Sequence, residues 1–159
     1  MSATTTKGGC QCGAVRYRAE GDIGYPHVCH CRMCQKAAGN YFMPLGGVSR
    51  ENFALTRGSP SWFQSSHLVR RGFCGQCGTP LFYDSPEAPS INITLGSLDN
   101  PAAWPPVMQS NLENRMPWSH LLHDLPIEPP AQDDSREQGI AKSTCQHPDH
   151  DTETWPPEG

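Results

Sequence analysis

The sequence predicts a small domain of mainly β structure, and three observations support this fold class. Gly and Pro are frequent, with 15 and 16 copies among 159 residues, and both favour turns and interrupt helices. Short alternating or apolar runs recur between these turn residues, which is typical of closely spaced strands. No apolar run approaches the roughly 18 residues that a membrane span requires, which excludes a membrane protein.

The expected elements follow one another closely along the chain. Residues 1–9 are a flexible lead-in, and an alternating run at 14–19 is the first strand, with Arg16 on its polar side. Residues 31–38 form a short helix, and the glycine pair at 46–47 breaks an extended run. The remaining strands are expected at 25–29, 41–45, 53–56, 62–66, 68–73, 81–83, 91–95 and 107–112.

Charge and composition divide the chain near residue 126. Residues 1–125 carry a net charge of +2, and residues 126–159 carry −6. The second segment is rich in Pro and acids, so it buries too little apolar area to offset the entropy cost of ordering. We expect a folded domain over 1–125 and an acidic, Pro-rich tail over 126–159, either disordered or draped over the domain. The weak positive charge of the domain disfavours nucleic-acid binding.

Seven of the eight cysteines fall in three short motifs: Cys10-x-Cys12, Cys29-x-Cys31-x2-Cys34 and Cys74-x2-Cys77. The N-terminus lacks the apolar stretch of a secretory signal, and disulfides are rare in a reducing cytoplasm. Clustered cysteines in a cytoplasmic protein indicate metal binding rather than a disulfide framework. Zinc is the expected metal, and an iron–sulfur cluster is the alternative that the spacing leaves open.

Locality divides these cysteines between two zinc ions. The triplet is compact enough to bind one ion alone, and the two pairs then share the other. The shared ion closes a long loop of the chain and so stabilises a small domain. Four thiolates close a zinc site, whereas three leave a position open, as catalytic zinc sites do. His30, inside the triplet, is the protein group that could close it. The expected structural ligands are Cys10, Cys12, Cys74 and Cys77, and the expected catalytic ligands are Cys29, Cys31 and Cys34.

Taken together, these motifs resemble the glutathione-dependent formaldehyde-activating enzyme family, the GFA or CENP-V/GFA domain. The resemblance rests on Cys-x-Cys-Gly-Ala-Val-x-Tyr at 10–17, on the triplet at 29–34, on Phe-Cys-x2-Cys-Gly-x2-Leu at 73–81, and on a closing segment at 115–118. It implies a β-tent fold of stacked antiparallel sheets with the same four-plus-three division of zinc ligands. It also implies a carbon–sulfur lyase that joins glutathione and formaldehyde into S-hydroxymethylglutathione. Gln109 departs from the pattern, because many members have His there.

The expected activity is the formation or cleavage of a thiol–aldehyde adduct. An open three-thiolate zinc could take a small thiol as fourth ligand and deprotonate it for attack on a small aldehyde. Glutathione is anionic, so we expect Arg32 and Lys36, which flank the triplet, to bind it, with Arg115 as a third candidate. The pocket walls could come from Trp62, Phe63, Trp104 and Trp118.

Two other functions fit the same residues. In a non-catalytic zinc-binding module both ions are structural, and the triplet gains a fourth protein ligand. A thiol redox sensor would release zinc on oxidation. The expected partners are a small thiol and a small aldehyde. We expect no binding to nucleic acid or membranes, and the sequence allows a homo-oligomer.

Overall fold

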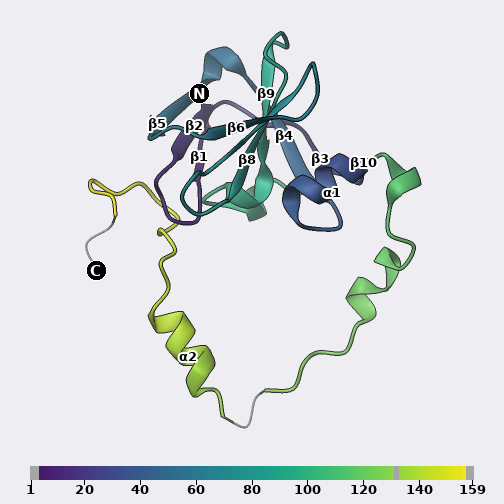
Figure 1. The fold of residues 1–159 in the computed structure, drawn as a ribbon, viewed down its shortest axis with the longest axis vertical. Helices are drawn as coiled ribbons and strands as arrows, with labels where there is room; N and C mark the ends of the chain where they lie inside the picture. The colour runs from purple at the N-terminus through teal and green to yellow at the C-terminus, as the bar shows by residue number, and fades with distance from the viewer. Residues whose placement is uncertain (1–3, 131–132, 157–159) are drawn as a thin grey trace.

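The computed structural model describes residues 4–130 and 133–156, which form two β-sheets and few short helices (Figure 1). The predicted mainly β fold class is confirmed. The smaller sheet has the order β1 (Thr5–Gly9), β2 (Arg16–Glu20), β5 (Phe53–Arg57). The larger sheet has the order β10 (Met108–Ser110), β3 (Gly24–Cys29), β4 (Met43–Ser49), β9 (Ser90–Thr94), β8 (Pro80–Asp84), β7 (Arg70–Phe73), β6 (Ser61–Gln64).

The helices are short and lie outside the sheets. The α-helices are α1 (Arg32–Ala38) and α2 (Ser135–Lys142). Single 3-10 turns are η1 (Arg50–Asn52), η2 (Leu95–Ser97), η3 (Pro101–Ala103), η4 (Leu112–Asn114) and η5 (Ser119–Asp124). None of the helices in the described part of the chain has the length and apolar character that crossing a bilayer requires.

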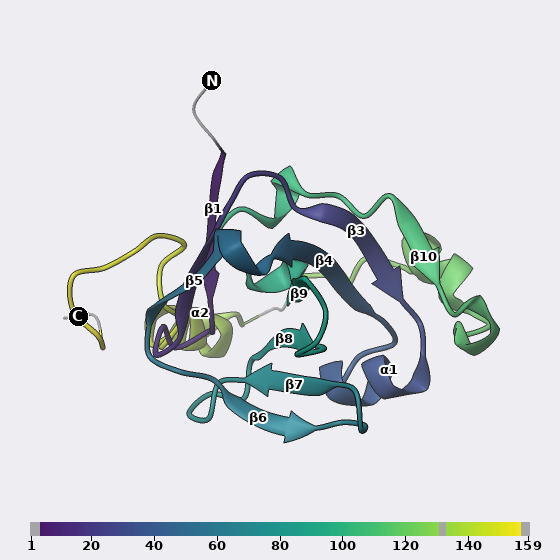
Figure 2. The same cartoon turned by 90° about the horizontal axis from the view of Figure 1, so that it is seen from above.

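Strand directions follow the prediction except at one edge. β10 pairs with β3 in parallel, placing Met108 opposite His27 and Ser110 opposite Cys29, whereas the other strand pairs are antiparallel. The predicted antiparallel arrangement therefore holds for the other strand pairs, and β10 is the exception. β9 runs in the same direction as β3, because both pair antiparallel with β4, and residues 95–107 form the long connection that returns the chain from β9 to β10. Figure 2 shows β3 and β10 side by side, with β6 and β7 at the opposite edge of the sheet.

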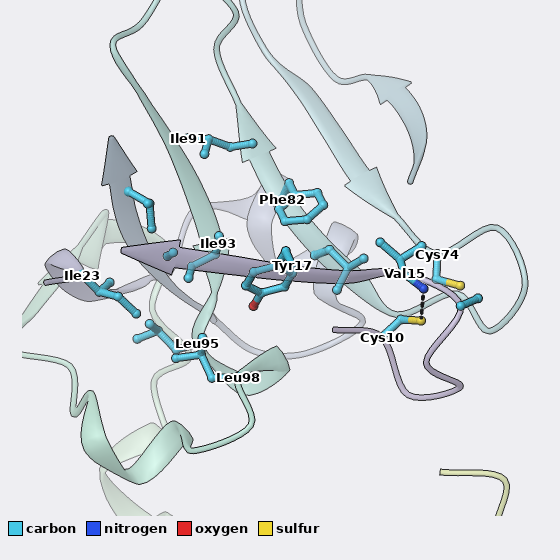
Figure 3. Close-up of a cluster of buried hydrophobic side chains, with 14 residues drawn as sticks. Cys10, Val15, Tyr17, Ile23, Cys74, Phe82, Ile91, Ile93, Leu95 and Leu98 are labelled. Carbon is cyan, nitrogen blue, oxygen red and sulfur yellow. Dashed lines mark hydrogen bonds between the residues drawn. The ribbon is translucent and has the colours of Figure 1, made fainter. Parts of the chain in front are cut away.

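The main hydrophobic core combines side chains from both sheets (Figure 3). Tyr17 on β2 is fully buried, its hydroxyl lies 2.6 Å from Ser97 Oγ, and its ring meets the edge of Phe82. Cys10 and Cys74 belong to the same buried cluster. The cysteine motifs therefore start from rigid, packed positions rather than from free loops.

Three local predictions were wrong. Within the supposed lead-in, Thr5–Gly9 form β1, because their backbone pairs with β2 although the sequence is polar; residues 1–3 lie outside the described residues. The glycine pair at 46–47 does not break β4. Gly46 instead makes room for Ile23, because a Cβ at this position would lie only 2.3 Å from Ile23 Cγ2. Arg16 is buried rather than solvent-facing, and its guanidinium forms a bidentate pair with Asp99 at 2.7 and 2.6 Å.

The C-terminal segment leaves the domain and returns to it. Figure 1 shows it descending after β10 and rising along α2 to the smaller sheet. There the His147 backbone N–H donates to the Gln11 carbonyl at 2.7 Å, and Asp151 pairs with Lys7 at 2.7 Å. The Trp155 indole N–H donates to the Cys12 carbonyl. The last described residues are thus draped over the domain, at the turn that follows β1.

Candidate metal centres

The first cysteine cluster joins the turn after β1 to the turn after β7. The sulfur atoms of Cys10, Cys12, Cys74 and Cys77 all lie within 4.8 Å of one another. The Cys10–Cys12 and Cys12–Cys74 sulfurs are 3.6 and 3.8 Å apart. Four sulfurs bound tetrahedrally to one zinc at about 2.3 Å would be spaced by about 3.8 Å. The donor set and its spacing therefore fit a closed tetrahedral metal site.

Local backbone geometry shapes this cluster. Gly13 and Gly78, which follow the second cysteine of each pair, have φ angles of 80° and 77°, a region that favours glycine. The turns aim backbone N–H groups at sulfur, with Val15 N 3.2 Å from Cys10 Sγ (Figure 3) and Gln76 N 3.4 Å from Cys74 Sγ. Such donors favour the thiolate form that a metal requires.

Without a metal, the thiols of Cys10, Cys12 and Cys77 differ in proton affinity. Burial raises the pKa of Cys10, and burial raises the pKa of Cys12 to about 12. Burial also acts on Cys77, but hydrogen bonds from the Thr79 hydroxyl and backbone N–H lower its pKa to about 6. A metal entering this site must therefore displace protons, so its affinity rises with pH.

The second cluster lies where β3 meets α1. Cys29 ends the strand, Cys31 caps the helix and Cys34 is in its first turn, and their sulfurs all lie within 4.8 Å of one another. The Cys31 sulfur accepts the Cys34 backbone N–H at 3.3 Å. Gly39, with φ of 59°, ends α1 in the left-handed conformation that favours glycine.

Polar neighbours oppose the burial of these thiols. Burial raises the pKa of Cys34 to about 12, although Arg71, 3.5 Å from the sulfur, acts in the opposite direction. For Cys29, hydrogen bonds from the Cys31 backbone N–H and the Ser110 hydroxyl outweigh burial and lower the pKa. The second cluster therefore holds both proton-retaining and easily ionised thiols.

The three-cysteine cluster faces a pocket of about 310 Å³. All three cysteines line it, and in the described part of the chain they have no fourth metal-ligating partner within the same radius. The other lining residues are His27, Met33, Leu45, Arg71, Tyr83, Asn92, Ser110 and Asn111. The four-cysteine cluster thus has the donors of a closed metal site, whereas the three-cysteine cluster leaves one position open towards the pocket.

His30, the expected competitor for the fourth position, points elsewhere. Its buried ring places Nε2 3.0 Å from Gln109 Oε1, and its Nδ1 has no partner among the described residues. Gln109, the departure from the family pattern, therefore serves to hold His30. His30 belongs to neither group of metal-ligating atoms.

The predicted thiol-binding cations line a second pocket, of about 390 Å³, beside the first. Arg32 and Lys36 lie there with Phe63, and both pockets share Met33 and Arg71. Arg115, the third candidate, is exposed after η4.

The other aromatic candidates do not line these two pockets. Trp62 lies under Arg70, Trp104 packs against the main core, and Trp118 meets Tyr41 edge-on. Their roles are therefore in packing, as is common for large aromatic side chains. Of the expected aromatic walls, only Phe63 is beside the predicted cations.

In the tail, Cys145, His147 and His150 form no cluster of ligating atoms among the described residues. His147 is buried, with Nδ1 2.7 Å from the Pro148 carbonyl and Nε2 3.2 Å from Arg57 Nη1. This pattern makes Nδ1 the donor and Nε2 the acceptor. His147 is thus a docking residue, a role that its sequence context does not indicate.

Sequence reasoning also missed Arg71, which contacts the second cluster directly. The available signal was a charged residue within a predicted strand, two positions before Phe73 and facing the same way. A charged residue in a strand is expected to face solvent when its partners are unknown, so the sequence did not mark Arg71 as part of the site.

The fold and the two clusters define the class of protein: it is mainly β, with one closed cluster of four cysteines and one open cluster of three. The family model described as glutathione-dependent formaldehyde-activating enzyme, GFA, matches residues 5–114. This chain therefore belongs to the GFA family.

Curated relatives agree with this assignment, and a solved structure shares the fold. A Halomonas elongata protein, provisionally named a glutathione-dependent formaldehyde-activating enzyme, is 29% identical over 125 residues, covering 72% of this chain and 80% of that protein. An Aspergillus flavus protein of the same provisional name is 29% identical over 75 residues, so the match covers 46% of this chain and 39% of the fungal protein. A Rhodobacter sphaeroides crystal structure shares the fold, with 19% identity, a TM-score of 0.53, and coverage of 65% of this chain and 99% of that one.

Proposed function

We propose that this protein is a cytoplasmic, zinc-dependent enzyme of the carbon–sulfur lyase type that forms or cleaves a thiol–aldehyde adduct, such as S-hydroxymethylglutathione. The observation that carries this proposal is the contrast between a closed four-cysteine site and an open three-cysteine site facing a pocket. Membership of the GFA family supports glutathione and formaldehyde as the reactants.

The residues present suit zinc at both sites. Cysteine sulfurs are soft donors, and those of the four-cysteine site have tetrahedral spacing. Cys10, Cys12, Cys74 and Cys77 would hold one ion, and Cys29, Cys31 and Cys34 the other. Zinc bound by three thiolates supplies a fourth position at which a thiol is held as its thiolate.

The protein's own side chains define where the reactants lie. The pocket at the three cysteines has room for a thiol sulfur and a small aldehyde. Asn111, whose Oδ1 lies 3.4 Å from Cys29 Sγ, and Ser110 line the wall beside the sulfurs. The charged body of the thiol would extend past Met33 into the neighbouring pocket, where Arg32 and Lys36 can pair with its carboxylates.

Metal content and exchange kinetics test the proposal together. Protein purified without added metal should contain about two zinc ions per chain, and Cys31→Ser should contain about one while keeping its thermal transition. Exchange NMR on glutathione and formaldehyde should show faster adduct interconversion with wild type than with Cys31→Ser.

Other outcomes point to the other functions. Two zinc ions without any acceleration would indicate a structural module, and zinc release under mild peroxide would indicate a redox sensor. Iron with visible absorption, or a single zinc in wild type, would overturn the four-plus-three assignment.

A further inference from the structure

Arg71 is a buried arginine without a carboxylate partner. The residue is 6% exposed, on β7, and no described acid lies within ion-pair distance of its guanidinium. The adjacent Arg70 points the other way and reaches Asp84 at 2.8 Å. A buried charge is usually paired with an opposite charge, and Arg70 has such a pair whereas Arg71 does not.

The Arg71 side chain is instead surrounded by sulfur and neutral groups. Its Nε donates to Ser65 Oγ at 3.1 Å, one Nη lies 3.7 Å from Met43 Sδ, and the other lies 3.5 Å from Cys34 Sγ. The Tyr83 ring lies 5.1 Å from the guanidinium carbon. Of these groups, the cysteine belongs to a cluster that becomes anionic when it holds a metal.

The charges at this cluster balance with Arg71 included. A divalent ion and three thiolates carry a net charge of −1, which one guanidinium neutralises. Replacing a neutral water in the fourth position by an anion adds a second negative charge. The Arg71 guanidinium favours that charge, because Arg71 and Cys34 are both buried and lie only 3.5 Å apart, where electrostatic interactions are weakly screened.

We propose that Arg71 is the counter-ion of the three-cysteine metal centre and makes its open position selective for an anionic fourth ligand, such as a thiolate, over a neutral one. This inference rests on the proposed metal occupancy and extends the proposed function to ligand selection. Arg71 is placed for this role because it lines both the cysteine pocket and the pocket of Arg32 and Lys36. An incoming thiol therefore passes its guanidinium.

Arginine suits this position better than lysine. Its planar guanidinium reaches Ser65, Met43 and Cys34 at once, whereas a lysine ammonium is a compact charge that cannot span them. Arg71 acts through charge at the metal centre, so it is a positioning residue in this scheme.

Ligand titrations of the Co²⁺-loaded protein test the inference without an activity assay. The four-cysteine site is closed, so changes in the cobalt spectrum on adding a ligand report on the open site. The probes are azide and 2-mercaptoethanol, which bind as anions, and imidazole, which binds as a neutral ligand. Wild type is compared with two uncharged variants, Arg71→Gln and Arg71→Met, and with Arg71→Lys.

We expect both uncharged variants to bind azide and the thiol about ten-fold more weakly than wild type, and imidazole within about two-fold. Arg71→Lys should retain most of the anion affinity. Lys142→Gln is the control, because it removes an exposed charge on α2 that lines neither pocket, and its azide affinity should stay within about two-fold of wild type.

Each remaining outcome has a separate meaning. Equal azide affinity in wild type and the uncharged variants would overturn the role of Arg71. Parallel losses for azide and imidazole would show a merely structural residue and would also overturn it. If no probe changes the wild-type spectrum although two cobalt ions are bound, the open site itself is wrong, and the proposed function fails with it.

Discussion

Single residues in this protein show how buried charge is accommodated. Asp84 is completely buried, yet its two carboxylate oxygens lie 2.5 Å from Arg50 and 2.8 Å from Arg70. Arg16 is likewise buried between Asp99 and Asp151. Arg71 is different because its counter-charge would come from a metal centre. The structural and the functional arginines are thus distinguished by what neutralises them.

The Asp84 pairs predict a large effect for a small substitution. Asp84→Asn removes the negative charge and leaves two arginines facing an uncharged, buried amide. Breaking a buried ion pair costs about 3 to 5 kcal/mol, and we expect the lower value because both arginines are partly exposed. Urea unfolding should show this loss, whereas the exposed control Glu87→Gln should change the free energy of unfolding by less than about 0.5 kcal/mol. A loss below about 1 kcal/mol for Asp84→Asn would show that the pairs are weak.

At the residue scale, the sequence was informative where ligands are close together in the chain. The cysteines lie in short motifs, so local spacing alone sorted them into the two groups that the structure brings together. Arg71 meets Cys34 across 37 positions, and Arg16 meets Asp151 across 135. No local pattern encodes such pairs, so both arginines were missed or misplaced.

Among the elements, the C-terminal segment 144–156 is one for which composition left two states open, disordered or draped over the domain. A few specific contacts fix its end to the smaller sheet and to the first cysteine turn, so this part of the tail is draped. His147 is central, because its ring packs where a Cβ on Gly13 would lie, 2.1 Å from His147 Cδ2. Gly13 therefore serves both the turn geometry and the docking of this segment.

Docking of this segment should depend on pH. Burial, with help from the charges of Arg16 and Arg57, lowers the pKa of His147, so protonation favours the undocked or unfolded chain. The contribution of His147 is therefore complete above about pH 6.5, the ordinary histidine pKa, and is lost as pH falls through the lower value of the folded state.

His147→Gln cannot be protonated in this range and serves to isolate the effect. At pH 7.5 we expect it to be less stable than wild type by about 1 kcal/mol in urea unfolding, and at pH 5 the difference should shrink. The exposed His150→Gln is the control and should not change this pH dependence. A constant gap between wild type and His147→Gln at both pH values would contradict the prediction.

The strands themselves were largely predictable, and their boundaries were less so. Alternating or apolar runs placed β2, β3 and β5 through β10 within a few residues. β1 was missed because its pairing with β2, and not its own polar sequence, makes it a strand. The Gly46–Gly47 pair in β4 was misread because a close contact with Ile23 is invisible in the sequence.

At the scale of the whole molecule, the two cysteine clusters have different structural weight. The four-cysteine cluster connects the end of β1 in the smaller sheet to the end of β7 in the larger sheet, across 62 positions between Cys12 and Cys74. The three-cysteine cluster closes only the short stretch from Cys29 to Cys34. Loss of the first removes a link between the sheets, whereas loss of the second frees one local turn.

This difference predicts unequal effects of removing each metal. Structural zinc sites contribute about 10 to 16 kcal/mol to folding in small domains, which is of the same size as the about 5 to 15 kcal/mol of a typical net stability. Cys74→Ser should therefore abolish the cooperative thermal transition, while Cys31→Ser should lower the Tm by only a few degrees. Cys145→Ser, which changes an exposed cysteine outside both clusters, controls for the substitution itself and should unfold like wild type. Calorimetry on the three variants decides the matter, because equal destabilisation by Cys74→Ser and Cys31→Ser would make both centres structural and would remove the physical basis for an open, reactive site.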